Sequence, residues 1–436
     1  MSKTGKSISR RQFMRGSAGA LAALGVGAGR LFAAGSDRIR VGLVGCGSRG
    51  MGAVRNCVDS SPNVEIVALG DLFQDRIDAG LALLKKDGDK DWSSSQPWQH
   101  ADRVKVTPDT CFTGFDAYQK VINSGVDLVL LATSPHFRPM HLRAAVAADK
   151  HVFMEKPVAV DPVGIRSVIE SSELAQQKSL AIVAGTQRRH DPKYVEVMKR
   201  VHNGDIGELV AGQCYWLGPC VRNWGFYHER QPSWTDMETQ CRNWYFYTWQ
   251  SGDHIVEQHV HNIDVINWAM GTHPVTALGL GGRQVRIEPQ FGNIYDHFAV
   301  EFEYPNGARI LSMARQTLGC AERVAERIVG AKGVAVEGLI EGAKPYKYEG
   351  PTPNPYEQEH ADLIASIRAG KPLNEGRQVA ESTMTAILGR MSVYTGRAIK
   401  WDWALKASKL DLTPPPYKFG DLPVAPVAMP GKTALI

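Results

Sequence analysis

The feature that most constrains this chain is an apolar run, residues 41–44, which turns directly into Gly45-Cys46-Gly47-Ser48-Arg49-Gly50. An apolar strand followed by glycines at this spacing is typical of a turn that binds a dinucleotide. In such a turn Gly45 permits the sharp bend, Gly47 lets a pyrophosphate approach the backbone, and Gly50 lets the next helix pack closely. The free amides at the start of that helix would then face an anion.

A second apolar run, residues 64–70, follows a segment of helix length and ends at Asp71. An acidic side chain at the end of the second strand lies about where the ribose diol of a bound nucleotide would be. The two motifs together therefore predict a nucleotide site and not an empty structural turn. Asp71 favours NAD over NADP, because a 2′-phosphate would meet its negative charge.

Residues 1–34 carry six basic side chains and no acidic one, and they include Ser9-Arg10-Arg11-Gln12-Phe13-Met14-Arg15. This pattern precedes a weakly apolar segment too short for a stable membrane span, and it predicts a twin-arginine export signal cleaved near Ala33-Ala34-Gly35. An ordinary disordered basic arm is the alternative. We expect the twin-arginine translocase as a partner, and a periplasmic or otherwise exported protein.

The basic character of the chain belongs to this leader. Without its six positive charges the formal net charge of +5 becomes about −1, so nucleic acid binding loses its main support. Twin-arginine substrates generally cross the membrane folded, so a nucleotide acquired in the cytoplasm should be held tightly.

The seven cysteines include no C-x-x-C pair and do not resemble a disulfide framework. Cys214, Cys220 and Cys241 could pair in an oxidising compartment, or they could remain buried thiols. The spacing alone leaves both alternatives open.

About 400 mature residues exceed what one core usually organises, so we expect two domains. Strands and helices alternate up to residue 154, which favours a doubly wound parallel sheet. Antiparallel patterns follow beyond residue 184, at residues 208–216, 276–286, 298–304 and 308–315. The tail from Leu412, with Pro414-Pro415-Pro416, is expected to be an extended arm over the surface.

A later apolar strand ends in Glu155-Lys156-Pro157. With the glycine pattern and Asp71, it resembles the family of glucose-fructose oxidoreductase, inositol dehydrogenase and the rhizopine catabolism proteins (Gfo/Idh/MocA). Three further stretches are similar to motifs of that family: residues 185–190, 203–208 and 364–372.

The resemblance covers nearly the whole mature chain. It implies an α/β fold: an N-terminal Rossmann domain with a doubly wound parallel sheet, and a C-terminal α+β domain with a large, mainly antiparallel, open-faced sheet. The boundaries we expect are a leader at 1–34, an NAD-binding domain at 35–158, a substrate and oligomerisation domain at 159–411, and a Pro-rich arm at 412–436. The open sheet face implies a homo-oligomer.

Residues 252–271 are predicted to form one helix that ends at Gly271. Glu257, His261 and Asp264 lie at i, i+4 and i+7, away from the apolar stripe. The stretch is similar to the family's Asp-x-x-x-His-x-x-Asp helix, with Glu257 as the acid and His259 in place of a small residue. Glu257, His259 and His261 could form a metal pocket, but residues two apart point to different helix faces, so we predict no metal.

The resemblance assigns catalytic roles to Lys156 and His261, with Glu257 orienting His261 and tuning its basicity. A lysine at the carboxyl end of a parallel strand can polarise or deprotonate a hydroxyl. The cofactor-binding residues we expect are Gly45, Gly47, Ser48, Arg49, Gly50, Asp71, Ser134, His136, Glu155 and Lys156.

Half of the ten tryptophans gather in residues 214–250, together with several tyrosines and phenylalanines. Flat aromatic faces edged by arginine and asparagine suit a polyol, because C–H faces stack on rings while hydroxyls bond to polar tips. A subunit interface or a local mini-core would need the same composition. The substrate-binding residues we expect are Arg188, His259, Trp224 and Tyr245.

We therefore predict an exported NAD-dependent oxidoreductase that transfers hydride between a hydroxyl-bearing carbon of a sugar, cyclic polyol or glycoside and a tightly bound nicotinamide cofactor. One alternative is an NAD-dependent glycoside hydrolase that oxidises C3 transiently, eliminates the aglycone and returns the hydride. A second alternative is a non-catalytic sugar-binding protein, whose function would survive a change of Lys156.

The export signal gives a first prediction. Changing Arg10 and Arg11 together to lysine should leave the protein in the cytoplasm, because the translocase reads the arginine pair. Fractionation of expressing cells measures this, with the unchanged sequence as the control. Undiminished export of the double variant would contradict the assignment.

Overall fold

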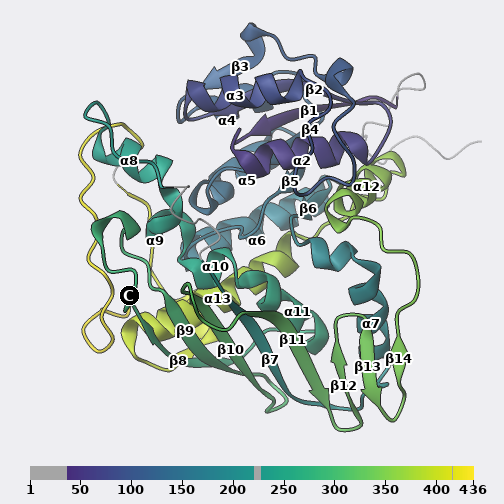
Figure 1. Cartoon of the computed structure of the whole chain (residues 1–436), viewed down its shortest axis with the longest axis vertical. Coiled ribbons are helices and arrows are strands. Elements are labelled where there is room, and N and C mark those ends of the chain that lie inside the picture. Colours follow the sequence, from purple (N-terminus) through teal and green to yellow (C-terminus); the bar gives the residue numbers. More distant parts are fainter. Residues whose placement is uncertain (1–36, 220–226, 415) are drawn as a thin grey trace, which may run out of the picture. The chain divides into compact units, whose positions relative to one another are not determined.

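The computed structural model describes residues 37–219, 227–414 and 416–436. The predicted leader lies outside these residues, and so do Cys220 and Trp224. From Asp37 on, the chain builds two separate β-sheets, one from its first part and one from its second (Figure 1).

The first sheet has six parallel strands in the order β3-β2-β1-β4-β5-β6. The strands are β1 (Ile39–Val44), β2 (Val64–Asp71), β3 (Cys111–Thr113), β4 (Leu128–Leu131), β5 (His151–Met154) and β6 (Ile182–Ala184). The helices between them are α2 (Ser48–Asp59), α3 (Gln74–Leu84), α4 (Ala117–Ile122), α5 (Arg138–Ala147) and α6 (Pro162–Gln177). All four residues of β4 are buried, as expected for a sheet covered on both faces. The predicted doubly wound parallel sheet is confirmed.

The strand order reverses between β1 and β4. From β1 the chain builds β2 and β3 on one side, and it then crosses over to build β4, β5 and β6 on the other. Such a reversal opens a crevice outside the carboxyl ends of the two strands, and this is where open α/β sheets bind ligands.

The parallel sheet continues beyond residue 158, where the sequence analysis ended the first domain. β6 pairs in parallel with β5, with Val152 opposite Ile182. Ile182, Val183 and Ala184 are fully buried. This three-residue strand therefore belongs to the core of the first sheet.

The second sheet has nine strands in the order β14-β13-β12-β11-β7-β10-β9-β8-β15. Its neighbouring pairs are antiparallel except for β10 with β7. The strands are β7 (Leu209–Gly218), β8 (Thr276–Gly282), β9 (His297–Glu303), β10 (Arg309–Gln316), β11 (Arg323–Gly330), β12 (Gly333–Val336), β13 (Leu339–Gly342), β14 (Tyr346–Lys347) and β15 (Ile399–Lys400). The expected mainly antiparallel sheet is therefore confirmed.

One face of the second sheet packs against α11 (Val260–Met270) and α13 (Gly376–Thr395). On β10, Ile310 and Ala314 point to that face and are buried, whereas Leu311 points the other way and is exposed. The remaining helices of the second part are α7 (Pro192–His202), α8 (Asp236–Arg242), α9 (Thr248–Ser251), α10 (His254–Glu257), α12 (Pro355–Arg368) and α14 (Trp401–Lys406). Over the described residues, no helix is both long and apolar enough to cross a membrane.

Residues 252–271 form two helices, α10 and α11, and not the single helix that their apolar stripe predicts. Between them the N–H of His259 bonds to the carbonyl of His254, five residues back, so the chain widens at this point. The ring of His259 bonds to the Ser312 hydroxyl on β10 (2.8 Å), which holds the widened turn against the sheet. This tertiary bond is not visible in the periodicity of the sequence.

Residues 412–436 contain no helix or strand in their described part and run beside α8 (Figure 1). At the start of this C-terminal arm, the N–H of Leu412 donates to the Asp161 carboxylate (2.9 Å). Further along, the carbonyl of Gly420 accepts from Met237 N–H (3.1 Å) on α8. The arm is thus fixed to both parts of the chain.

The cysteines of the described residues are free thiols, so Cys214 and Cys241 do not pair. Both are buried, and burial raises the pKa of each thiol to about 12. Cys214 lies 3.6 Å from the His259 ring, and Cys241 accepts a hydrogen bond from Gln250. The sequence left open whether these cysteines pair or stay buried thiols. Cys214 and Cys241 are buried free thiols.

A buried ion pair gives the second prediction. Arg189 donates two hydrogen bonds, each 2.9 Å long, to Asp264 on α11. Asp264→Ala would leave the largely buried guanidinium without its partner, so the free energy of unfolding should fall by about 3 to 5 kcal/mol.

Denaturant unfolding measures the change. The matched control is Glu173→Ala, which breaks the half-exposed pair with Arg377 and should cost about 1 kcal/mol or less. Equal losses in the two variants would contradict the structural role of the Arg189–Asp264 pair.

Candidate active site

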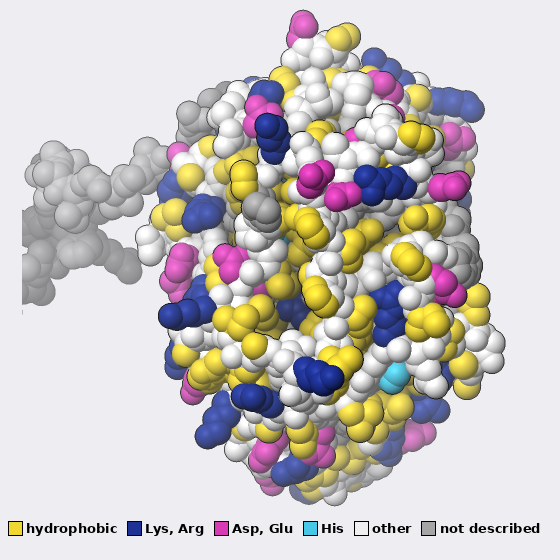
Figure 2. All heavy atoms as spheres, turned by 90° about the vertical axis from the view of Figure 1, so that its left-hand side faces the viewer, with side chains coloured by type: hydrophobic (Ala, Val, Ile, Leu, Met, Phe, Trp, Pro, Cys, Tyr) yellow, Lys and Arg dark blue, Asp and Glu magenta, His cyan; other side chains and the backbone are white. Residues whose placement is uncertain are grey.

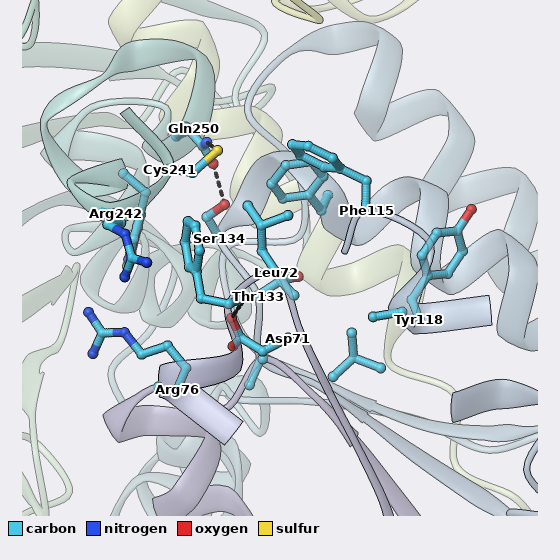
Figure 3. A pocket seen from close by; sticks show the side chains of 18 of the residues that line it. Asp71, Leu72, Arg76, Phe115, Tyr118, Thr133, Ser134, Cys241, Arg242 and Gln250 are labelled. Atoms are coloured by element: carbon cyan, nitrogen blue, oxygen red, sulfur yellow. Dashed lines mark hydrogen bonds between the residues drawn. The ribbon is translucent and has the colours of Figure 1, made fainter. Parts of the chain in front are cut away.

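The crevice at the carboxyl ends of β1 and β4 forms a cleft (Figure 3). The first part of the chain lines it with residues that include Gly47, Asp71 and Ser134, and the second part with Arg242 and Gln250. The Ser134 hydroxyl donates to the Gln250 side-chain carbonyl and so joins the two parts at the rim (Figure 3). Of the expected cofactor residues, Gly45, Gly47, Ser48, Asp71 and Ser134 line this cleft.

The three glycines of the turn differ in what surrounds them. Gly45 has φ of +102°, and a Cβ there would lie 2.6 Å from the Ala132 backbone. A Cβ on Gly50 would lie 1.9 Å from the carbonyl oxygen of Gly45, so α2 packs directly on the turn. A Cβ on Gly47 would meet no atom within 4 Å. Gly45 and Gly50 are therefore required by the fold, whereas Gly47 leaves space that a ligand can use.

These surroundings fit a dinucleotide. Gly47 is the N-cap of α2, and its position carries no side-chain cap, so the first-turn amides are free of a capping side chain. An anion such as a pyrophosphate is stabilised at that place. Gly47, Ser48 and the α2 amides would hold the pyrophosphate, and Asp71 would face the ribose.

Asp71 ends β2 inside the cleft (Figure 3). Its carboxylate accepts from the N–H of Cys46 (2.7 Å) and from the N–H of Phe73 (3.0 Å). Burial raises the pKa of Asp71, and the two backbone donors oppose that rise. The carboxylate therefore braces the glycine turn.

Five of the expected cofactor residues are absent from the cleft lining: Gly50, which packs on the turn, and Arg49, His136, Glu155 and Lys156. Arg49 Nε donates to Glu155 (2.5 Å), so the two residues pair with each other behind the turn, outside the cleft lining. Burial lowers the pKa of Arg49, but the charges of Glu155 and Glu359 outweigh this effect and raise it. His136 is also absent from the lining, because its ring bonds to the Tyr417 hydroxyl (2.9 Å) in the C-terminal arm.

Lys156 follows β5 and reaches across to the second part of the chain. Its ammonium donates to the backbone carbonyl of Glu257 (2.8 Å) and lies 3.5 Å from the carboxylate of the same residue. In an unbroken helix that carbonyl would accept from residue 261. The N–H of His261 instead bonds to Gln258, so the break between α10 and α11 leaves the Glu257 carbonyl for Lys156.

His261 begins the first turn of α11 beside Trp216. The two rings stack with centroids 5.9 Å apart. Burial lowers the pKa of His261 well below its ordinary value, and the charges of Lys156, Arg188 and Arg49 lower it further. At neutral pH the imidazole is therefore uncharged and able to accept a proton.

Glu257 does not take the position that the family motif implies. Its carboxylate lies near Lys156 and accepts from the Gln258 amide (2.5 Å). Among the described contacts, no hydrogen bond joins Glu257 to His261. Because of the helix break, Glu257 and His261 do not have the regular i, i+4 geometry. The Glu257 carboxylate lies beside the Lys156 ammonium instead.

Arg188 is held by Glu326 on β11, a residue that the sequence analysis did not single out. Glu326 also accepts from the Asn262 amide and from the Tyr194 hydroxyl (3.1 Å). Asn262 is adjacent to His261, so this network fixes the start of α11. A lone glutamate in a strand gives no signal in the sequence, because its partners come from two distant segments, residues 188–194 and Asn262.

His259 and Tyr245, expected to bind substrate, are both buried. The His259 ring faces Ser312 under the sheet, and burial lowers its pKa to about 3. The Tyr245 hydroxyl accepts from Gln316 (2.5 Å) in a mini-core with Phe246 and Phe291. The local mini-core is thus the correct interpretation for Tyr245, and Trp224 lies outside the described residues.

The described residues hold no group of three or more His, Cys, Asp and Glu side chains arranged to bind a metal ion. Glu257, His259 and His261 point to three different partners: Lys156, Ser312 and Trp216. Because of the helix break, these three side chains do not come together as the metal pocket considered above.

The fold and the glycine cleft define a dinucleotide-binding oxidoreductase with two domains. Residues 39–185 match the model of an oxidoreductase family with an NAD-binding Rossmann fold, and residues 198–363 match that family's C-terminal alpha/beta domain. The chain belongs to this family, Gfo/Idh/MocA.

Among its relatives, inositol 2-dehydrogenase 3 of Saccharopolyspora erythraea is 27% identical over 272 residues, which are 62% of this chain and 65% of that protein. The 2,7-anhydro-N-acetylneuraminate hydratase of Escherichia coli is 25% identical over 42% of this chain and 44% of its own. The chain thus spans less than two thirds of the length of these relatives.

The fold is also similar to that of scyllo-inositol dehydrogenase from Lactobacillus casei, whose crystal structure contains NAD(H) and scyllo-inositol. The TM-score is 0.61 at 16% identity, over 84% of this chain and 99% of that one.

The contrast between two glycines gives the third prediction. Gly47→Ala should keep the melting temperature of the protein, because its Cβ meets no protein atom, but it should weaken NADH binding by about tenfold or more by crowding the pyrophosphate. Gly50→Ala should lower the melting temperature, because its Cβ would overlap a backbone carbonyl. Calorimetric titration and thermal melts measure the two effects. Unchanged NADH affinity in Gly47→Ala would contradict the placement of the pyrophosphate.

Proposed function

We propose that the protein is an NAD-dependent dehydrogenase that oxidises a CH–OH group of a cyclic polyol or sugar. One observation carries the proposal: a lysine ammonium fixed at Glu257 and an uncharged histidine close enough for that ammonium to lower its pKa. Dehydrogenation of an alcohol needs a group that takes the hydroxyl proton and a cation that stabilises the developing oxyanion.

Each side chain has its own role in the proposed oxidation. When bound, NAD supplies the hydride acceptor. Lys156 polarises the hydroxyl oxygen and stabilises its negative charge, and His261 takes the proton at a ring nitrogen. Glu257 holds the Lys156 ammonium in place through its carbonyl and its carboxylate. Trp216 holds the His261 ring in one orientation through their stacked faces.

The nature of the substrate is supported by the relatives. The inositol dehydrogenases named above act, by their names, on cyclic polyols. A ring such as Trp216 beside the proton acceptor offers an apolar face for the C–H side of such a substrate. NAD is proposed ahead of NADP because Asp71 stands in the cleft.

A redox-neutral reaction is the second candidate, and the relative named as a hydratase favours it. In this case oxidation of a ring carbon would be transient, and elimination or addition of water at a neighbouring carbon would be the net change. The glycoside hydrolase considered above is one form of it. Incubation with polyols, free sugars and glycosides separates the candidates: net NADH marks the dehydrogenase, and aglycone release or hydration without net NADH marks the redox-neutral enzyme.

Export and assembly complete the proposal. The twin-arginine pattern supports a periplasmic location, and the open face of the second sheet supports a homo-oligomer. Leu278, Leu280 and Leu311 are exposed on strands β8 and β10, and exposed apolar patches often mark interfaces. Light scattering that gives the mass of one chain would contradict the oligomer.

The fourth prediction tests the shared hydroxyl. Lys156→Met and His261→Ala should each lower kcat by roughly 10²-fold or more, and the double variant should lose much less than the product of both effects, because the two groups act on one oxygen. His261→Ala should retain NADH binding, measured by fluorescence titration. Near-normal turnover of His261→Ala would contradict the assigned proton acceptor.

The fifth prediction concerns pH. His261 must be neutral to accept the proton, and its pKa is lowered well below 6.5, mainly by burial. Activity should therefore persist as the pH falls through 6.5, and it should be lost only below the depressed pKa. In Lys156→Met the acidic limb of the kcat/KM profile should move toward neutral pH, because a neighbouring positive charge is gone. If the acidic limb of the kcat/KM profile is unchanged in Lys156→Met, an electrostatic interaction between Lys156 and His261 is contradicted.

A further inference from the structure

The C-terminal arm crosses the outer side of the nucleotide cleft. Two of its aromatic side chains, Tyr417 and Phe419, lie against loops that follow β2, β3 and β4. Hydrophobic side chains are spread over the face of the molecule that carries α8 and the arm (Figure 2). The arm therefore covers the part of the first domain in which the cleft is formed.

The rings that the arm touches are themselves walls of the cleft. Phe73, Phe115 and Phe137 line it, each from a different loop of the first domain. Phe419 stacks on Phe73 with centroids 6.0 Å apart and lies 5.4 Å from Phe115. Tyr417 lies 5.7 Å from Phe115 and 5.4 Å from Phe137. Two arm residues thus contact all three phenylalanines from outside.

The position of these two arm residues is fixed by polar contacts on either side. The Tyr417 hydroxyl bonds to the His136 ring (2.9 Å), and His136 is not among the residues that line the cleft. Beyond Phe419, the carbonyl of Leu422 accepts from the Gln240 side chain (2.6 Å) on α8, and the Leu422 N–H donates to Asp236 (3.2 Å). The arm therefore links the first-domain loops to α8.

The same part of α8 leads into the opposite wall of the cleft. Cys241 and Arg242 line it, and Leu422 of the arm packs in one apolar cluster with Met237 and Cys241. Opening the cleft on this side requires the phenylalanine loops and α8 to move apart. Each such movement breaks contacts that the arm makes with both.

We propose that Tyr417 and Phe419 are positioning residues for the cofactor: they hold the phenylalanine walls of the cleft closed and so slow the release of bound nicotinamide nucleotide. The proposal rests on the proposed function, since it assumes that the cleft binds this nucleotide. A slow release matches a protein that must carry its cofactor through export. The two residues touch the walls and not the cofactor, so they change its release and not the chemical step.

The test is the dissociation rate of NADH from the full chain, followed by stopped-flow fluorescence after mixing with excess NAD. The double variant Tyr417→Ala, Phe419→Ala should release NADH about tenfold faster or more, because aromatic contacts on three walls are lost together. Tyr417→Phe, which keeps the ring and loses the hydroxyl that bonds to His136 and Thr413, should lie between the double variant and the unchanged protein. Val424→Ala, an exposed change in the same arm, is the matched control and should leave the rate unchanged.

Melting temperatures separate positioning from unfolding. The double variant should melt within a few degrees of the control, because Tyr417 and Phe419 lie at the partly exposed surface and a large chain shifts by only a few degrees per kcal/mol. Faster release at a retained melting temperature supports the proposal, and an unchanged release rate overturns it. If the double variant melts early, Tyr417→Phe alone decides: its rate must still exceed that of Val424→Ala. Absence of NADH binding in the unchanged protein would instead refute the proposed function.

Discussion

The hydrogen bond from the Lys156 ammonium to the backbone carbonyl of Glu257 is the contact on which the rest of the site depends. It connects the end of a parallel strand in the first domain to a helix break in the second. The bond is possible because α10 stops after one turn and leaves this carbonyl without its usual partner. In a regular helix over the same residues, the Glu257 carbonyl would accept a hydrogen bond from a backbone N–H of the helix. The Lys156 ammonium would then pair only with the Glu257 carboxylate. The break is therefore part of the chemistry of the site, although the ring that stabilises it, His259, faces the sheet.

Charge around this contact is arranged to keep His261 neutral. Lys156, Arg188 and Arg49 all lie close enough to oppose its protonation, and each cation is balanced by a carboxylate of its own: Glu257, Glu326 and Glu155. A buried cation without a partner would be strongly unfavourable. Burial is the main cause of the lowered pKa of His261, and the charges of Lys156, Arg188 and Arg49 act in the same direction. Arg49 of the Gly-x-Gly-x-x-Gly turn thus pairs with Glu155 and is not among the residues that line the cleft.

Much of the fold could be predicted because its signals are local. Apolar runs of strand length, Gly45 and Gly50 at their fixed spacing, and Asp71 at a strand end each reflect one short piece of backbone. Lys156 and His261 were assigned catalytic roles through motifs that resemble the family, and these roles stay predictions. What the sequence did not reveal depends on contacts between distant segments: Glu326 beside Arg188, Trp216 against His261, and the arm against Phe115. Tyr245 and His259 were misplaced for the same reason, since aromatic and polar composition does not tell a binding surface from a buried cluster.

The proposed function requires that the nucleotide cleft and the Lys156–His261 pair form a single site. A crystal structure of the protein with NADH bound tests this claim most directly. We expect the pyrophosphate to lie against the Gly47 backbone. The nicotinamide should lie beside the Lys156 ammonium, with its ring facing His261. A nicotinamide directed away from Lys156, or a nucleotide bound outside the glycine cleft, would contradict it.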